Sequence, residues 1–357
     1  MADIDLLSTA FSMLSEPVAV SRRSKILYMN QAAIKLAGKD LSGKPLDMLM
    51  PLHISNNQAD NFITTAFIGS KNCTVKVSPA NGLRIYAISY DAPIAEPSEA
   101  VLSCLRSSMS NIKFAASCIS VIAEDIANDK LTEYVNTLNR SYYRVKRALD
   151  NLGTLSGIAA GTLPFHPRPT DITDLCRNII ETVSLLTEKQ DINISFLAEE
   201  HMRIVADREL VSRLLLNLLS NSLLNCRRGG RISVSLLRTG STLVMCVDDD
   251  GRGIEPDELA FVFDRYKHSE CLTHPVGSGI GLAVAKGIAE LHGGALIIES
   301  RGEDMGTSVR VMLSYDTPPE RGLSAPEALY NDADMQTILT ELSGCLTINC
   351  YSEYLND

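Results

Sequence analysis

At 357 residues the chain is longer than one ordinary domain, so two or three domains are expected. Hydrophobic residues make up 45% of it and charged residues 21%, which is typical of a soluble globular protein. The formal net charge of −10 argues against the clustered basic surface that nucleic-acid binding requires. No nucleic-acid partner is therefore expected.

Three further features of the sequence predict a cytoplasmic protein. No apolar run approaches the roughly 20 residues that cross a bilayer. The N-terminus, Met1-Ala2-Asp3-Ile4-Asp5, is acidic and lacks the basic region of a secretory signal. The nine cysteines are scattered, odd in number and form no Cys-x-x-Cys pair, as expected for reduced thiols.

Residues 1–95 predict a small mixed α/β unit. A strand at 26–30 runs into a helix at 31–37 that ends at Gly38, and further strands are expected at 61–69, 73–77 and 84–90. The stretch Asn30-Gln31-Ala32-Ala33, followed by Gly43-Lys44-Pro45-Leu46, resembles a PAS sensor domain. Two roles stay open for it: a dimerisation or packing module, or a sensor of a small ligand.

After a linker with two prolines, residues 98–160 carry apolar residues at alternating spacings of three and four. The first series comprises Leu102, Leu105, Met109, Ile112, Ala116, Ile119, Ala123 and Ile126, and the second comprises Leu131, Val135, Leu138, Tyr142, Val145, Leu149 and Leu152. Sustained spacing of this kind is typical of helices that pack side by side. With a short turn at 128–130, it predicts an antiparallel helical hairpin. One hairpin cannot bury this seam alone, so a homodimeric four-helix bundle is expected.

Residues 168–316 predict a second globular domain. Helices are expected at 171–188, from the N-cap Asp207 onward, and at 282–291. Strands are expected at 192–197, 203–206, 232–236, 243–247, 295–299 and 308–313. Three helices against a mostly antiparallel sheet form an α/β sandwich, and the whole chain is thus of the α+β class. Residues 317–357 carry little pattern beyond a helix near 334–342.

Two glycine strings and an asparagine pair mark the chemistry of this domain. Asp249-Asp250-Gly251-Arg252-Gly253-Ile254 follows a buried strand, and Gly277-Ser278-Gly279-Ile280-Gly281-Leu282 precedes a helix. Glycine lets a backbone approach a ligand closely or take positive φ. Asn217 and Asn221 lie one turn apart on a helix, and their amide oxygens suit Mg²⁺. The combination predicts a purine-triphosphate site without a P-loop.

These motifs resemble the ATP-binding domain of sensor histidine kinases, within the wider family that includes gyrase and MutL. Leu216 to Asn221 resembles the asparagine box, Asp249 to Ile254 and Gly277 to Leu282 the two glycine boxes, Phe261 to Tyr266 the phenylalanine box, and Gly306-Thr307 the last motif. With the PAS-like start and the hairpin, the resemblance covers about nine-tenths of the chain, and all five ATPase motifs stand in the family's order.

The resemblance implies ATP and Mg²⁺ as ligands. Asp249 would accept a hydrogen bond from the adenine amine, and Asn221, helped by Asn217, would hold Mg²⁺. Gly277, Gly279 and Gly281 would hinge a short lid over residues 266–276. The remaining nucleotide contacts implied are Gly251, Gly253, Ile254, Phe263, Tyr266, Ser278, Ile280, Leu282 and Thr307. Water-activating relatives carry a glutamate where this chain has Asn217, so the kinase branch is favoured.

The chain departs from the family pattern at two places. The hairpin contains no histidine, and Ser110 and Asn111 stand where the phosphoacceptor histidine and its acidic neighbour are expected. A serine hydroxyl needs a base to act as a nucleophile, and Asn111 is not one. Leu224 replaces a basic residue after the asparagine box, and Arg227 or Arg228 is the candidate substitute.

Three functions follow as alternatives. The chain is an ATP-binding histidine kinase homologue that signals without its own phosphohistidine, as a pseudokinase or regulatory partner. Alternatively, it is an active kinase whose acceptor is Ser110 or a histidine on another protein. The third alternative is an ATP-dependent switch unrelated to phosphotransfer. The expected macromolecular partners are a second copy of the chain and either a response regulator or a partner kinase.

Overall fold

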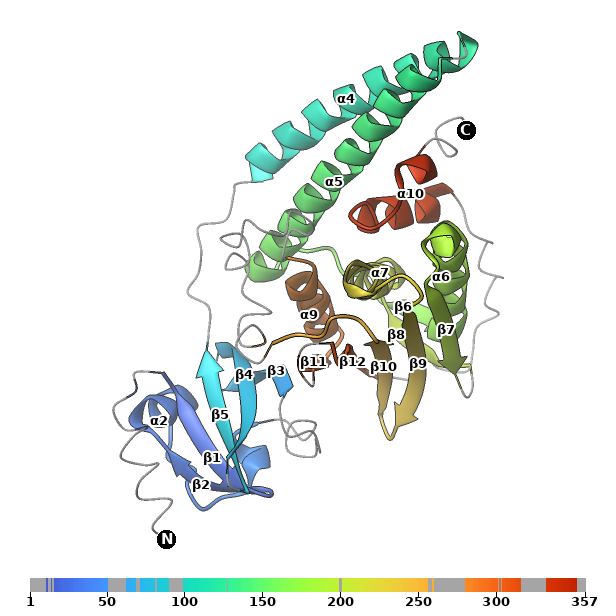
Figure 1. Ribbon diagram of the computed structural model, residues 1–357. Coiled ribbons are helices and arrows are strands. Elements are labelled where there is room, and N and C mark those ends of the chain that lie inside the picture. Colours follow the sequence, from blue (N-terminus) through green and yellow to red (C-terminus); the bar gives the residue numbers. More distant parts are fainter. Residues whose placement is uncertain are drawn as a thin grey trace.

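The computed structural model describes residues 16–50, 62–68, 71–80, 82–89, 99–126, 128–198, 201–255, 280–300, 304–315 and 332–351, with four isolated positions (Phe11, Leu14, Leu259 and Gly302). They form an N-terminal sheet with one short helix, a long helical hairpin and a larger α/β sandwich (Figure 1). The α+β architecture expected from the sequence is confirmed. Within the described ranges, no helix is long and apolar enough to cross a membrane.

The described N-terminal residues form a five-stranded antiparallel sheet with one α-helix. It consists of β1 (Val18–Arg22), β2 (Lys25–Met29), α2 (Gln31–Ala37), the 3₁₀ helix η1 (Leu46–Met48), β3 (Phe62–Ile68), β4 (Lys71–Ala80) and β5 (Leu83–Ser89). The side chain of Asn30 caps α2 by accepting from the Ala33 N–H at 2.9 Å, and Gly38 ends the helix with φ 74°. The predicted helix is confirmed. Strand β1 was not predicted, although its first four residues are buried.

The helical hairpin consists of α4 (Glu99–Asp125) and α5 (Asp129–Ala160). The sequence placed Asp129 and Lys130 in the turn, but they form the first turn of α5 because the Asn128 side chain caps the Leu131 N–H. Several seam residues are buried: Leu102, Ala116, Ala123, Val135 and Leu149. Other seam residues remain exposed: Leu105, Ile112, Ile119, Ile126, Leu138 and Val145. The hairpin therefore keeps an uncovered apolar face.

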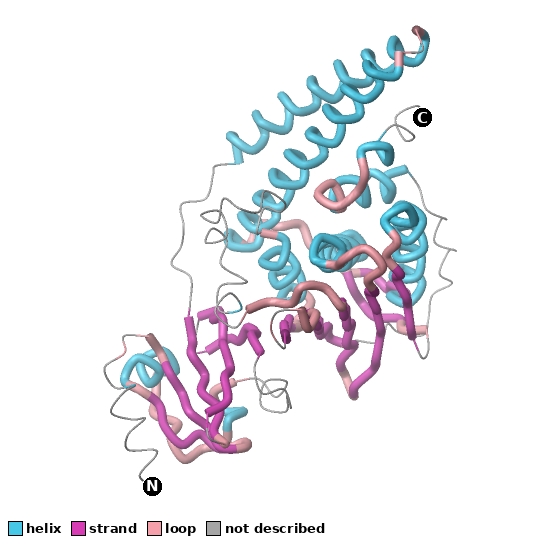
Figure 2. The backbone as a smooth tube through the Cα atoms, in the orientation of Figure 1, coloured by secondary structure: helices cyan, strands magenta, loops and turns pink. Residues whose placement is uncertain are grey.

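The sandwich contains β6 (Arg168–Asp171), α6 (Ile172–Thr187), η2 (Glu188–Gln190), β7 (Asn193–Ala198), β8 (Arg203–Ala206), α7 (Arg208–Asn225), β9 (Arg231–Thr239), β10 (Thr242–Asp249), α9 (Gly281–Leu291), β11 (Ala295–Ser300) and β12 (Thr307–Ser314). Helices α6, α7 and α9 lie on the same side of the sheet (Figure 2). Helix α7 has leucines on every side, and most of them are buried because it lies between the sheet and other helices.

The N-terminal sheet and the main sheet of the sandwich form one continuous sheet. The strand order is β2-β1-β5-β4-β3-β11-β12-β10-β9-β7, and β6 and β8 form a separate pair. Strand β3 pairs antiparallel with β11, with Ile63 opposite Ile298 and Thr64 opposite Ile297. The Thr64 hydroxyl also donates to the Leu296 carbonyl at 3.0 Å. The N-terminal sheet thus extends the sheet of the sandwich.

The C-terminal segment, α10 (Asp332–Glu341) with the 3₁₀ helix η4 (Ile348–Tyr351), packs between α5 and α7 (Figure 1). Its buried residues belong to the main core: Ile338, Leu339, Leu342, Leu346 and Tyr351. The Tyr351 ring lies 5.3 Å from the ring of Tyr143 on α5. The helix expected near 334–342 is confirmed, and its packing joins the hairpin to the sandwich.

Candidate nucleotide-binding site

Asp249, the last residue of β10, is held in place from two sides. Its Oδ2 accepts a hydrogen bond from the Ser222 hydroxyl at 2.9 Å, and its Oδ1 accepts from the Gly251 N–H at 3.0 Å. Burial raises the pKa of Asp249, and these hydrogen bonds oppose that rise. The carboxylate is therefore a fixed, partly desolvated acceptor. On β12, Thr307 pairs with Asp249 in the sheet.

The first glycine string passes between two backbones that leave no room for side chains. A Cβ on Gly251 would lie 2.6 Å from the Asn225 carbonyl oxygen. Gly253 has φ 71°, and a Cβ there would lie 2.1 Å from the Gly302 oxygen. Ile254 follows, and its N–H donates to the Ser300 hydroxyl at 2.9 Å. These glycines fix the loop after Asp249 between the end of α7 and the turn after β11.

Helix α7 carries the two asparagines in different surroundings. Asn217 is buried: its Oδ1 accepts from Arg147 Nη2 at 3.2 Å, and its Nδ2 donates to Glu341 Oε2 at 3.2 Å and to the Arg213 carbonyl at 3.0 Å. Asn221 is half-buried, and its backbone carbonyl accepts from Asn225 Nδ2 at 2.7 Å. The amide oxygen of Asn217 thus already has a cationic donor.

The described end of the second glycine string lies directly against Asn217. Gly281 is the first residue of α9, and a Cβ on it would lie 2.6 Å from Asn217 Oδ1. Its neighbours Ile280 and Leu282 are half-buried. The other expected contacts of this region lie outside the described residues: Phe263, Tyr266, Gly277, Ser278 and Gly279. Helix α7 therefore contacts both motifs, Asp249 through Ser222 and Gly281 through Asn217.

The basic residue beside this site comes from an unexpected element. Arg227 is paired with Asp304, and Arg228 is exposed. Arg147 of α5 reaches Asn217, although it stands in the hairpin, 70 residues earlier in the chain. Nothing in the local sequence distinguishes Arg147 from the other basic residues of its helix.

On the hairpin, Ser110 and Asn111 are both exposed on α4. The Ser110 hydroxyl donates to the Arg106 carbonyl at 3.1 Å, so its proton is directed back to its own helix. Lys113, one turn later, has its Nζ 5.2 Å from the centre of the Tyr143 ring, and burial lowers its pKa to about 8. The surroundings described for Ser110 supply no activating base.

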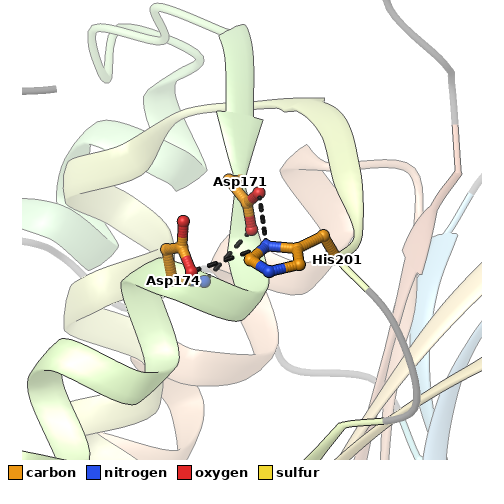
Figure 3. Close-up of side chains that lie close together, drawn as sticks. All are labelled: Asp171, Asp174 and His201. Atoms are coloured by element: carbon orange, nitrogen blue, oxygen red, sulfur yellow. Dashed lines mark hydrogen bonds and ion pairs between the residues drawn. The ribbon is translucent and has the colours of Figure 1, made fainter. Parts of the chain in front are cut away.

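A separate cluster lies at the start of α6, where Asp171, Asp174 and His201 come together (Figure 3). Asp171 caps α6 by accepting from the Asp174 N–H at 3.1 Å. His201 Nδ1 lies 3.2 Å from Asp171 Oδ2 and 3.5 Å from Asp174 Oδ1. Helix capping and a contact between an exposed histidine and two carboxylates account for this arrangement.

Comparison with known proteins agrees with the motifs. Residues 206–317 match the family described as histidine kinase-, DNA gyrase B- and HSP90-like ATPase. The sensor histidine kinase ZraS of Salmonella typhimurium is 30% identical over 198 residues, which are 55% of this chain and 40% of that protein. These matches support a histidine kinase family for this chain.

A second histidine kinase relative and one solved structure extend this comparison. The sensor histidine kinase YvrG of Bacillus subtilis is 25% identical over 190 residues, 53% of this chain and 33% of that protein. The chain thus spans less than half the length of these two curated histidine kinases. The structure of full-length ShkA in complex with AMPPNP has a TM-score of 0.53 at 19% identity, covering 62% of this chain and 47% of ShkA, and supports the fold.

Proposed function

We propose that this histidine kinase homologue binds ATP through the site around Asp249. The fixed carboxylate is an acceptor that suits the exocyclic amine of adenine and not the carbonyl of guanine. The first-turn N–H groups of α9 suit phosphate, since Ile280 at the N-cap offers no side-chain acceptor. Mg²⁺, when bound, would neutralise phosphate charge. Asn221 is the candidate ligand, and Asn217 could join it only after its amide oxygen gives up the hydrogen bond from Arg147.

The absence of histidine from the hairpin sequence supports a signalling role without autophosphorylation there. Ser110 and Asn111 take the expected positions of acceptor and acid, and the Ser110 hydroxyl donates to a carbonyl. A hydroxyl without a base is a weak nucleophile at neutral pH. We therefore favour a pseudokinase or regulatory partner in two-component signalling, whose nucleotide state is passed to a second protein.

The partner arrangement follows from the uncovered apolar face of the hairpin. Ile112 and Ile119 are 42% and 38% exposed although they belong to the seam. A second hairpin would bury them in a four-helix bundle. A homodimer of this kind would present α4 and α5 to a response regulator or a partner kinase.

One experiment separates the alternatives. The protein is incubated with Mg²⁺ and γ-labelled ATP, alone and then with candidate response regulators, and label is tested for stability in acid and base. The favoured function predicts that the chain binds nucleotide, as measured by calorimetry, and that it carries no label. Acid-labile, base-stable label would establish a phosphohistidine, and acid-stable label lost in Ser110→Ala would establish Ser110 as acceptor. Either result replaces the favoured function by an active kinase.

A further inference from the structure

The C-terminal helix places one carboxylate at the phosphate end of the proposed site. Glu341, at the end of α10, is buried. Its Oε1 accepts from Arg213 Nε of α7 at 2.7 Å, and its Oε2 accepts from Arg147 Nε of α5 at 3.1 Å. Its Oε2 also lies 3.2 Å from Asn217 Nδ2. One carboxylate thus joins three elements.

These contacts resemble those that a phosphate group would make. Arginine side chains recognise carboxylates and phosphates through the same planar donors. The side chains of Arg147 and Arg213 are only 12% and 17% exposed, so their charges are poorly screened by solvent. Asn217, which bonds both Glu341 and Arg147, also contacts the first residue of α9, Gly281.

The sequence around the site accommodates the C-terminal segment. Leu224 stands where relatives would carry a basic residue. Its Cδ1 lies 3.8 Å from the position of a Cβ on Gly344, just after α10. The same position lies 3.7 Å from Arg147 Nη1. An apolar residue at 224 therefore packs where α10 continues into its turn, and a lysine there would place a charge in this contact.

We propose that Glu341 is an internal competitor of the nucleotide, and that its carboxylate takes the place of the terminal phosphate between Arg147, Arg213 and Asn217. This proposal rests on the proposed ATP binding at Asp249. Binding of a triphosphate would release α10 and free the two arginines to hold phosphate. Because α10 also joins α5 to α7, its release would loosen the hairpin from the sandwich. A diphosphate, lacking the terminal group, would leave the segment in place.

The test uses the full chain and compares Glu341→Gln with Asp334→Asn. Glutamine keeps the shape of Glu341 and removes its charge. Asp334 lies on the same helix and pairs with Arg208 at 3.5 Å. Its substitution therefore weakens the attachment of α10 and leaves the contacts of Glu341 with Arg147 and Arg213 unchanged. Affinities for AMPPNP and ADP are measured by calorimetry.

Glu341→Gln should tighten AMPPNP binding by roughly 5- to 150-fold, the usual range of coupling between two ligands. ADP binding by Glu341→Gln and both affinities of Asp334→Asn should stay near wild type.

Hydrogen exchange of residues 332–351 in the wild-type protein gives a second readout that does not depend on a variant folding. Saturating AMPPNP should accelerate exchange in α10, and saturating ADP should not. Protection of α10 by AMPPNP, or unchanged AMPPNP affinity in Glu341→Gln, would overturn the competition. In either case, weaker AMPPNP binding in Asp249→Asn than in the wild-type protein would still support the proposed ATP site. If neither nucleotide bound any variant, the ATP proposal would itself be wrong.

Discussion

The imidazole of His292 accepts a hydrogen bond from the backbone N–H of Asp207 through Nε2 at 3.0 Å. Its Nδ1 lies 2.8 Å from the Ile288 carbonyl and therefore carries the proton. Asp207 in turn caps α7 through the Leu210 N–H at 3.2 Å. A neutral histidine at the end of α9 thus fixes the start of the helix that carries the asparagines.

Acid should weaken this link. Burial lowers the pKa of His292 below its unfolded value of about 6.5. Between the two values the unfolded chain binds more protons than the folded one, so the free energy of unfolding falls as the pH falls through this window. Denaturant unfolding of wild type and His292→Gln, followed from about pH 7 to pH 4, checks this. Parallel pH profiles for the two proteins would contradict the assignment.

Removing the charge at Asp249 should weaken nucleotide binding. An asparagine presents a mismatched amide to the adenine amine, and loss of a charged hydrogen bond costs about 1.5–3 kcal/mol, or roughly 10- to 150-fold in Kd. Calorimetry with ADP on Asp249→Asn measures the loss. Ser222→Ala removes only one supporting hydrogen bond and should have a smaller effect. Equal affinities in wild type and Asp249→Asn would mean that this carboxylate does not contact the base.

A glycine beside Asp249 offers a test of backbone packing. Gly306 has φ 74°, and a Cβ there would lie 2.1 Å from the Asp249 carbonyl oxygen. Gly240 has φ 61° with nothing within 4 Å of its Cβ position. Both alanine variants carry the left-handed penalty of about 1–2 kcal/mol, but only Gly306→Ala must also displace the backbone. Thermal unfolding and ADP binding should therefore suffer more in Gly306→Ala. Matching losses would show that the clash is relieved without cost.

The exposed seam of the hairpin predicts a dimer that charges placed in the seam disrupt. Glutamate at both Ile112 and Ile119 would bury two carboxylates in the four-helix core, which is strongly unfavourable. Light scattering at micromolar concentration should show a dimer for wild type and a monomer for the double variant. Ser108→Glu, on an exposed position of α4, is the control and should remain dimeric. A monomeric wild-type protein would remove the bundle from the proposal.

The sequence predicted what local pattern determines. The apolar spacing of three and four predicted both hairpin helices. The N-cap residue Asp207 predicted the start of α7, and the alternation at 232–236 predicted β9. The glycine strings pointed to Asp249 and Gly281, which both contact α7. In each case the signal lies within a few residues of the feature it predicts.

The missed features are contacts between distant segments. The Arg147–Glu341 pair spans 194 residues, and its members look like ordinary charged positions on helices. The pairing of β3 with β11 likewise depends on two strands whose patterns do not specify a neighbour. These distant contacts matter most for Asn217, because its side chain bonds Arg147 of α5 and Glu341 of α10, which the sequence of its own helix does not reveal.

The continuous sheet has a consequence for dividing this protein into fragments. Strand β3 covers the backbone edge of β11, and Ile63 packs with the core of the sandwich while Ile297 packs with the N-terminal core. A fragment starting at the hairpin would present an unpaired β11 edge and a bare isoleucine to water. Open strand edges recruit other strands, so such a fragment is expected to self-associate through β11. The oligomeric state of such a fragment would then reflect the exposed edge of β11 and not association through the hairpin.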